Sequence, residues 1–180
     1  NITISLWIKL PLNEEVWQQR TVINGLDGVY IFNVQRRSSG WSYGARAQLI
    51  NQETWTDDLG AIGTEWNHVV FTQEPNGEKN TINKIYLNGQ KIKEENLGRG
   101  DRSYNGENSL LIGTFRDTES GNAFRGQLDD IRIYGSTLNA TEIKTLFDKE
   151  SEGVTPDDAI TISPGLLSGE YYAFAKDDNI

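Results

Sequence analysis

The sequence has no cysteine, no methionine and only one histidine. Without cysteine the chain can form neither a disulfide nor a thiolate metal site. The single histidine, His68, excludes a histidine-rich zinc site. The absence of methionine indicates a processed or excised piece of a longer protein, so we expect any signal peptide to lie outside these residues.

Long apolar runs and an excess of basic charge are missing as well. No apolar run approaches the roughly 20 residues needed to span a bilayer, so we expect no membrane insertion. The 17 Lys and Arg against 26 Asp and Glu give a net charge of −9. Nucleic-acid-binding proteins present basic surfaces, so we expect no nucleic-acid partner. Most of the acidic charge is interpreted as a solvated exterior.

What the chain does contain is a series of short apolar runs separated by turns. Its 180 residues, 18 glycines and 10% aromatic content favour one large all-β domain. Residues 2–10 alternate apolar and polar side chains, which predicts a half-buried strand. Asn88-Gly89 between 82–87 and 90–93 is the strongest hairpin signal. Strands at this spacing predict a sandwich of two antiparallel sheets.

Further strands are expected along the rest of the chain. They cover residues 21–24, 29–34, 41–50, 66–72, 109–113, 124–134, 160–162 and 170–175. The segment 51–63 reads as a loop with a short strand. On 41–50, Trp41 and Tyr43 fall on one side.

One short helix is predicted near residues 139–148. Asn139 is a good N-cap, and Glu142 three residues later completes a capping box. Leu138 before the cap can staple onto Ile143. The apolar helical face would carry Ile143, Leu146 and Phe147.

This combination resembles the laminin-G-like jelly-roll modules of the concanavalin A-like lectin and glucanase superfamily. The earlier matching stretches are 2–9, 66–72 and 85–90. The closing stretch matches at Phe124, Gly126, Asp129, Asp130, Arg132, Tyr134, Leu138, Glu142 and Ile143. The resemblance implies an all-β, two-sheet antiparallel jelly-roll sandwich with one concave and one convex sheet, in a single domain over residues 1–180.

The end of the chain departs from the family pattern. Such modules begin with an aromatic strand carrying two aspartates; in this sequence the stretch that looks like that strand is residues 169–180. With 1–150 as the core and 151–168 as a connecting segment, we expect 169–180 to complete the sandwich. The strand would pair in its own chain or in a neighbouring copy, and would cover an open sheet edge. The alternative is a linker to a next domain.

A calcium ion is the expected cofactor. Asp129 would share a strand face with Ile131 and Ile133, where an unpaired carboxylate is costly. Calcium binds carboxylate and carbonyl oxygens, and the resemblance implies a structural calcium at Asp129. The expected ligands are Asp129, Asp177, Asp178 and Gly126. The alternative is that Asp129 lies at a strand end, solvated or bonded to backbone amides.

A glycan or polysaccharide is the expected partner, because a flat aromatic ring flanked by polar groups suits a sugar. The candidate binding residues are Trp41, Tyr43, Trp55, Arg46, Arg116 and Asp117. For each tryptophan, burial in the core is the alternative.

Catalysis is not expected. The glucanase Glu-x-Asp-x-Glu triplet is absent, and no Gly-x-Ser-x-Gly elbow accompanies His68. We therefore predict a non-catalytic carbohydrate-binding module of a larger secreted or cell-surface protein of bacterial origin. An adhesion or spacer module that contacts protein partners, or neighbouring copies or domains, is the alternative. A polysaccharide-cleaving enzyme is a weaker one.

Overall fold

The computed structural model describes ten segments of the chain, which form eleven strands and one helix. The described residues are 1–11, 19–25, 30–36, 40–47, 54–57, 65–78, 80–98, 110–114, 123–152 and 160–162. The elements are β1 (Ile2–Lys9), β2 (Gln19–Gly25), β3 (Tyr30–Arg36), β4 (Trp41–Ala47), β5 (Thr54–Trp55), β6 (Asn67–Asn76), β7 (Asn80–Leu87), β8 (Gln90–Gly98), β9 (Leu110–Ile112), β10 (Gly126–Tyr134), α1 (Ala140–Ser151) and β11 (Ile160–Ile162).

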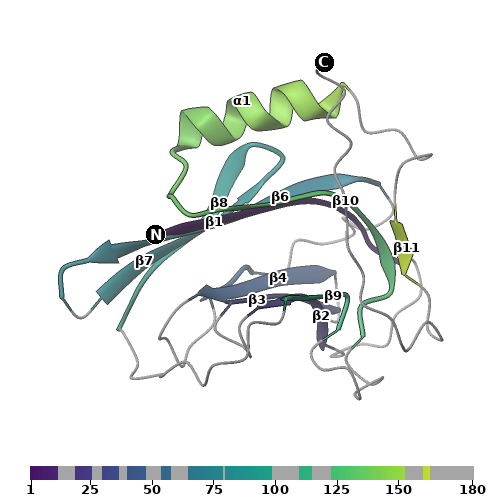
Figure 1. The fold of residues 1–180 in the computed structure, drawn as a ribbon, viewed down its shortest axis with the longest axis horizontal. Helices are drawn as coiled ribbons and strands as arrows, with labels where there is room; N and C mark the ends of the chain where they lie inside the picture. The colour runs from purple at the N-terminus through teal and green to yellow at the C-terminus, as the bar shows by residue number, and fades with distance from the viewer. Residues whose placement is uncertain are drawn as a thin grey trace.

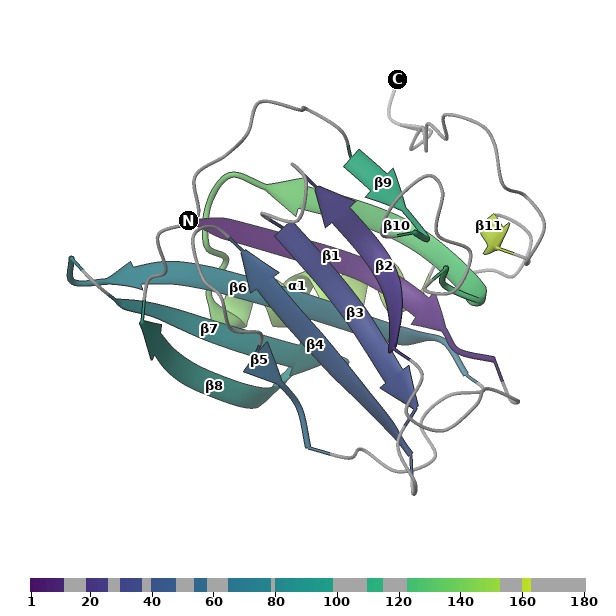
Figure 2. The ribbon, with the colours of Figure 1, turned by 90° about the horizontal axis from the view of Figure 1, so that it is seen from below.

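The strands form two stacked sheets. One has six strands in the order β11-β10-β1-β6-β7-β8, and the other has five in the order β5-β4-β3-β2-β9. Neighbouring strands within each sheet pair antiparallel. In Figure 1 the sheets are two layers, with α1 on the outer face of the six-stranded sheet. Figure 2 shows the five-stranded sheet in front of the six-stranded one. The predicted jelly-roll sandwich is confirmed.

The core lies between the two sheets. Inward-facing side chains of β1 and β6 meet those of β3 and β4, as the period-2 alternation requires. Among the described residues, sixteen buried hydrophobic side chains form this cluster: Ile2, Ile4, Leu6, Ile8, Leu10, Val22, Ile23, Phe32, Val34, Trp41, Tyr43, Val69, Phe71, Ile85, Phe124 and Leu128.

β1 is buried on both faces, which corrects the prediction of a half-buried strand. Its outward residues Thr3, Ser5 and Trp7 are 0%, 0% and 4% exposed. The reason is α1, which covers that face (Figure 1). A local sequence pattern cannot report a cover that comes from residues more than a hundred positions away.

The start of α1 is built as predicted. Asn139 Oδ1 accepts hydrogen bonds from the backbone N–H groups of Thr141 and Glu142, and Glu142 Oε2 accepts one from Asn139 N. Leu138 packs beside the buried Ile143. The helix continues to Ser151, three residues past the predicted end, and this added turn contains Glu150. No helix in the described part of the chain is long and apolar enough to cross a membrane.

The Asn88-Gly89 hairpin is also confirmed. Both residues have positive φ, 49° and 77°, as a type I′ turn requires. β8 runs to Gly98, beyond the predicted end at residue 93, because β8 is a charged edge strand without an apolar alternation to mark it.

The segment after the helix returns to the six-stranded sheet. Ile160–Ile162 forms β11, as predicted, and pairs with residues 126–128 of β10. The predicted sandwich-completing strand at 169–180 lies outside the described residues.

Candidate functional site

Two of the aromatic residues predicted to contact a sugar lie in the core instead. Trp41 is 4% exposed and Tyr43 is 0% exposed. Tyr43 packs on Phe32 with ring centroids 6.0 Å apart, and burial raises the pKa of Tyr43 well above its usual value. The predicted binding role of Trp41 and Tyr43 is therefore wrong. Their common side of the strand was predicted correctly, but this side faces the opposite sheet.

Trp55 lies on the outward face of the five-stranded sheet. It sits in β5 directly opposite Gly44 of β4. A Cβ atom at Gly44 would lie 2.5 Å from Cδ2 and Cε2 of Trp55, so the indole covers the glycine closely. A side chain at position 44 would displace the ring. Trp55 is partly exposed to solvent, unlike Trp41.

The short segment that carries Trp55 is fixed by the threonines on either side. Thr54 and Thr56 are 0% and 3% exposed. Thr56 N donates to the carbonyl of Tyr43 over 2.9 Å, and Tyr43 N donates to Thr56 Oγ1 over 3.0 Å. Because side chains alternate along a strand, inward threonines hold Trp55 outward.

Polar residues lie on the same sheet face as Trp55. Asn33 lies opposite Gly44 in the register of β3 and β4, and Gln35 lies opposite Ser42. Ser42 Oγ lies 3.2 Å from the carbonyl of Thr56 and 3.4 Å from that of Asp57, so the segment after β5 lies close to Ser42. Gln35 is partly exposed and Asp57 is exposed.

We call this set, Trp55 with Gly44, Asn33, Gln35, Ser42 and Asp57, the Trp55 face. Trp55, Gln35 and Asp57 are accessible to solvent on this face, whereas Asn33 and Ser42 are buried, at 1% and 0% exposure. Of the other predicted ligand-binding residues, Arg46 lies in β4, but its side chain is outside the described part of the structure. Arg116 and Asp117 are outside the described residues altogether.

Asp129 does not lie on the predicted face. β10 has a bulge: Arg132 is opposite Ser5 and Asp129 is opposite Trp7, so two residues of β10 match one of β1. Asp130, with φ of 46°, is one of them. The extra residue reverses the alternation, and Asp129 points outward with Trp7 rather than inward with Ile131. The prediction that Asp129 shares the face of Ile131 and Ile133 is therefore wrong.

The bulge removes one argument for calcium, since Asp129 is not forced into an apolar face. Asp129 Oδ1 accepts a hydrogen bond from Asp130 N over 2.8 Å. This matches the alternative in which Asp129 bonds to a backbone amide. Gly126 has a packing role, because a Cβ there would lie 2.5 Å from the carbonyl oxygen of Lys9.

Calcium takes six to eight oxygen ligands. Within the segments that the structure describes, no three His, Cys, Asp or Glu side chains come together in a way that could hold a metal ion. Asp177 and Asp178 lie outside those segments. Calcium binding stays a prediction.

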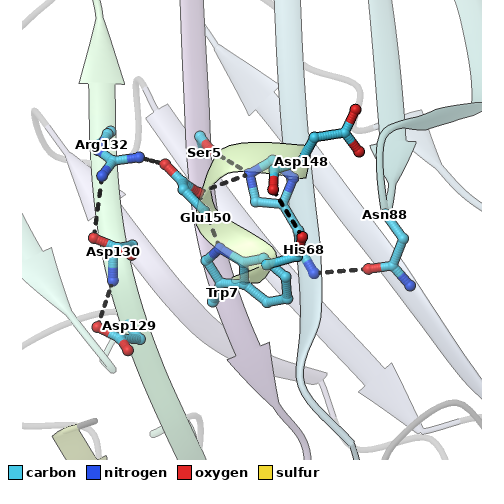
Figure 3. A network of polar contacts seen from close by, with 10 residues as sticks. Ser5, Trp7, His68, Asn88, Asp129, Asp130, Arg132, Asp148 and Glu150 are labelled. Carbon is cyan, nitrogen blue, oxygen red and sulfur yellow. Dashed lines mark hydrogen bonds and ion pairs between the residues drawn. The ribbon is translucent and has the colours of Figure 1, made fainter. Parts of the chain in front are cut away.

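A second polar cluster lies beneath α1, and sequence analysis missed it (Figure 3). Glu150 Oε2 accepts a hydrogen bond from Trp7 Nε1 over 2.9 Å and lies 3.5 Å from His68 Nε2. Glu150 also pairs with Arg132, which in turn contacts Asp130 over 3.2 Å. The helical stretch past residue 148 carries no apolar signal, so the sequence did not reveal that Glu150 would be buried.

The cluster contains Ser5, His68 and Glu150, but it is not a catalytic triad. Ser5 Oγ lies 2.8 Å from His68 Nε2, the same nitrogen that Glu150 approaches. A triad needs the carboxylate on the other ring nitrogen, and His68 Nδ1 has no partner among the described residues. Ser5 and His68 are both 0% exposed, so no substrate reaches them.

The electrostatics of the cluster keep His68 neutral. Burial, and then the positive charge of Arg132, lower the pKa of His68 to about 4. The imidazole ring also packs against Trp7 and Phe147, with centroids 5.3 and 6.0 Å away. His68 is a structural strand residue, as predicted.

Two stacked antiparallel sheets with a capped helix on one outer face define a lectin-type jelly-roll module. The profile of the concanavalin A-like lectin/glucanases superfamily matches residues 1–144, and the chain belongs to this family. No curated protein matches the chain.

Solved structures share the fold at low sequence identity. A Bacteroides ovatus protein described as a candidate carbohydrate-binding protein matches with a TM-score of 0.58 and 18% identity, over 79% of this chain and 39% of that chain. Domain 4 of AbnA, an extracellular GH43 arabinanase of Geobacillus stearothermophilus solved with arabinotriose, matches with a TM-score of 0.52 and 18% identity. The match covers 81% of this chain and 65% of that chain.

A third structure is the Trypanosoma rangeli sialidase, with a TM-score of 0.55 and 17% identity over 87% of this chain and 24% of that one. At these identities the likeness establishes the fold alone. The chain spans less than two thirds of the length of each of these three proteins.

Proposed function

We propose that the chain is a non-catalytic carbohydrate-binding module of a larger secreted or cell-surface protein, and that the Trp55 face binds the sugar. The observation that carries the proposal is the position of Trp55, which lies against Gly44 on an outer sheet face and remains partly exposed.

The chemistry of this face suits a sugar. The C–H face of a pyranose or furanose ring is apolar and packs on a flat aromatic ring, while its hydroxyls need donors and acceptors around it. Trp55 supplies the ring, and Gln35 and Asp57 supply accessible polar groups. Trp55 is also set firmly, because Thr54 and Thr56 on either side of it are buried.

A binding role without cleavage is supported by two observations. The Glu-x-Asp-x-Glu triplet of related glucanases is absent from the sequence. The one histidine is enclosed beneath α1 in a hydrogen-bonded cluster, where it can neither accept a proton from a substrate nor donate one.

The experiment measures retention and cleavage together. The purified chain is incubated with a panel of polysaccharides, and both bound protein and new reducing ends are measured. Arabinan is included because the similar arabinanase domain was solved with arabinotriose, and sialylated glycans because of the similar sialidase. Retention without new ends is expected. New reducing ends would show that the chain is an enzyme. If the protein is retained on no glycan, the adhesion or spacer role is favoured.

A further inference from the structure

A chain of buried amides crosses the sandwich and ends on the segment that carries Trp55. Asn83 of β7 is 0% exposed. Its Oδ1 accepts a hydrogen bond from Gln73 Nε2 over 2.9 Å, and its Nδ2 donates one to Thr54 Oγ1 over 3.0 Å. Gln73 and Asn83 belong to the six-stranded sheet, whereas Thr54 belongs to the five-stranded one. The chain of bonds therefore joins the two sheets at β5.

The position of Asn83 in the core is unusual for an amide. Asn83 has the inward parity of Ile85, a core residue, so an aliphatic side chain would suit the strand pattern. A buried amide is costly unless its groups are bonded. Asn83 uses both its oxygen and its nitrogen, and satisfied networks of this kind fix one arrangement of a core.

The hydrogen bond from Asn83 matters for β5, because few other pairing contacts hold this strand in place. It has two residues, lies at the edge of its sheet and has two register pairs with β4. The pairing of a strand this short contributes little stability by itself. The bond from Asn83 holds the Thr54 hydroxyl inward, and alternation then directs the next side chain, Trp55, outward onto Gly44.

We propose that Asn83, oriented by Gln73, is a positioning residue for Trp55. It contacts no sugar and lies in the opposite sheet, yet it sets the angle and the rigidity of the indole. The inference rests on the proposed function and adds that Asn83, a buried core residue, contributes to the affinity for the sugar.

Fluorine NMR tests the positioning without any sugar. The chain is labelled with 5-fluorotryptophan, which gives five resonances for its five tryptophans, and Trp55→Phe assigns the resonance of Trp55. Asn83→Leu and Thr54→Val each remove the bond, the second by exchanging a hydroxyl for a methyl group. Ser5→Ala is the control, because it removes a different buried polar contact, the one with His68.

We expect the Trp55 resonance to shift and broaden in Asn83→Leu and Thr54→Val and to stay unchanged in Ser5→Ala. A Trp55 resonance of unchanged position and width in both variants overturns the proposal. If Asn83→Leu does not fold, Thr54→Val decides the outcome by itself.

The second measurement is affinity for a polysaccharide that the parent chain retains. Asn83→Leu or Thr54→Val should weaken binding about fivefold to tenfold, the equivalent of one hydrogen bond. Ser5→Ala should bind as the parent does, even at a similar loss of Tm. Equal weakening in Ser5→Ala, or none in the two variants, overturns the role of Asn83. If no glycan is retained at all, the proposed function fails, while the fluorine result still decides whether Asn83 positions Trp55.

Discussion

Trp7 Nε1 donates a hydrogen bond to Glu150 Oε2 over 2.9 Å, which joins the first strand to the last turn of α1. The same carboxylate pairs with Arg132 of β10 and lies 3.5 Å from His68 Nε2 of β6. Glu150 therefore connects the helix to three neighbouring strands. The residue is buried, with 8% of its surface exposed.

Replacing Glu150 by alanine should destabilise the fold. The change leaves the buried Trp7 N–H without its acceptor and removes one of the two carboxylates that Arg132 contacts, which costs about 1–3 kcal/mol of the free energy of unfolding. Urea denaturation measures this loss. Glu152→Ala is the matched control, because Glu152 is exposed just past the helix end, and it should stay within about 0.5 kcal/mol. Equal unfolding midpoints for the two variants would contradict the role of Glu150.

His68 should make stability depend on pH. Its pKa is about 4 in the folded chain and 6.5 in the unfolded one. The unfolded state therefore takes up a proton first as pH falls, and stability that is fully present above pH 6.5 is lost towards pH 4, by up to roughly 3 kcal/mol. Unfolding curves across this range measure it. The free energy of unfolding should depend less on pH in His68→Gln than in the parent. If the variant shows the same pH dependence as the parent, the carboxylates rather than His68 cause it.

Calcium binding, predicted at Asp129 with Asp177, Asp178 and Gly126, has a direct thermal test. A ligand that binds the folded state alone stabilises it by RT ln(1 + [L]/Kd), about 2.7 kcal/mol at a hundredfold excess over Kd. Tm should fall in chelator and recover when calcium is added. Asp129→Asn should not respond. The same melting curve with and without chelator would show that the parent chain binds no stabilising calcium ion.

The predicted strand at 169–180 is tested by deletion of residues 168–180, which keeps β11. We expect lower stability or self-association, because an uncovered sheet edge favours pairing between chains. Size-exclusion chromatography and thermal unfolding report both effects. A shortened chain that remains soluble, monomeric and as stable as the parent would show that the segment is a linker.

The fold could be predicted from local patterns wherever these carry a clear signal. The alternation of Ile2 to Leu10, the Asn88-Gly89 turn and the Asn139 cap each fix backbone geometry through neighbouring residues alone. All three appear in the structure at the predicted positions.

The site could be predicted only in part, because it depends on which face of a strand the rest of the chain covers. Alternation placed Trp41 and Tyr43 together but did not show that their side faces the opposite sheet. One bulged residue at Asp130 reversed the expected direction of Asp129. Asn83 and Glu150 gave no signal, since a buried polar residue looks like an exposed one until its distant partners are known.

Trp55 is proposed to form the sugar-binding surface, and the affinity of the Trp55→Ala variant for a glycan tests this most directly. Isothermal titration with a polysaccharide that the parent retains should show binding weaker by about 1–3 kcal/mol, using base stacking on aromatic side chains as a guide. Leu110→Ala is the control, since Leu110 is 51% exposed at the opposite edge of the same sheet; it should bind as the parent does. A folded Trp55→Ala variant with the parent's affinity would contradict the claim.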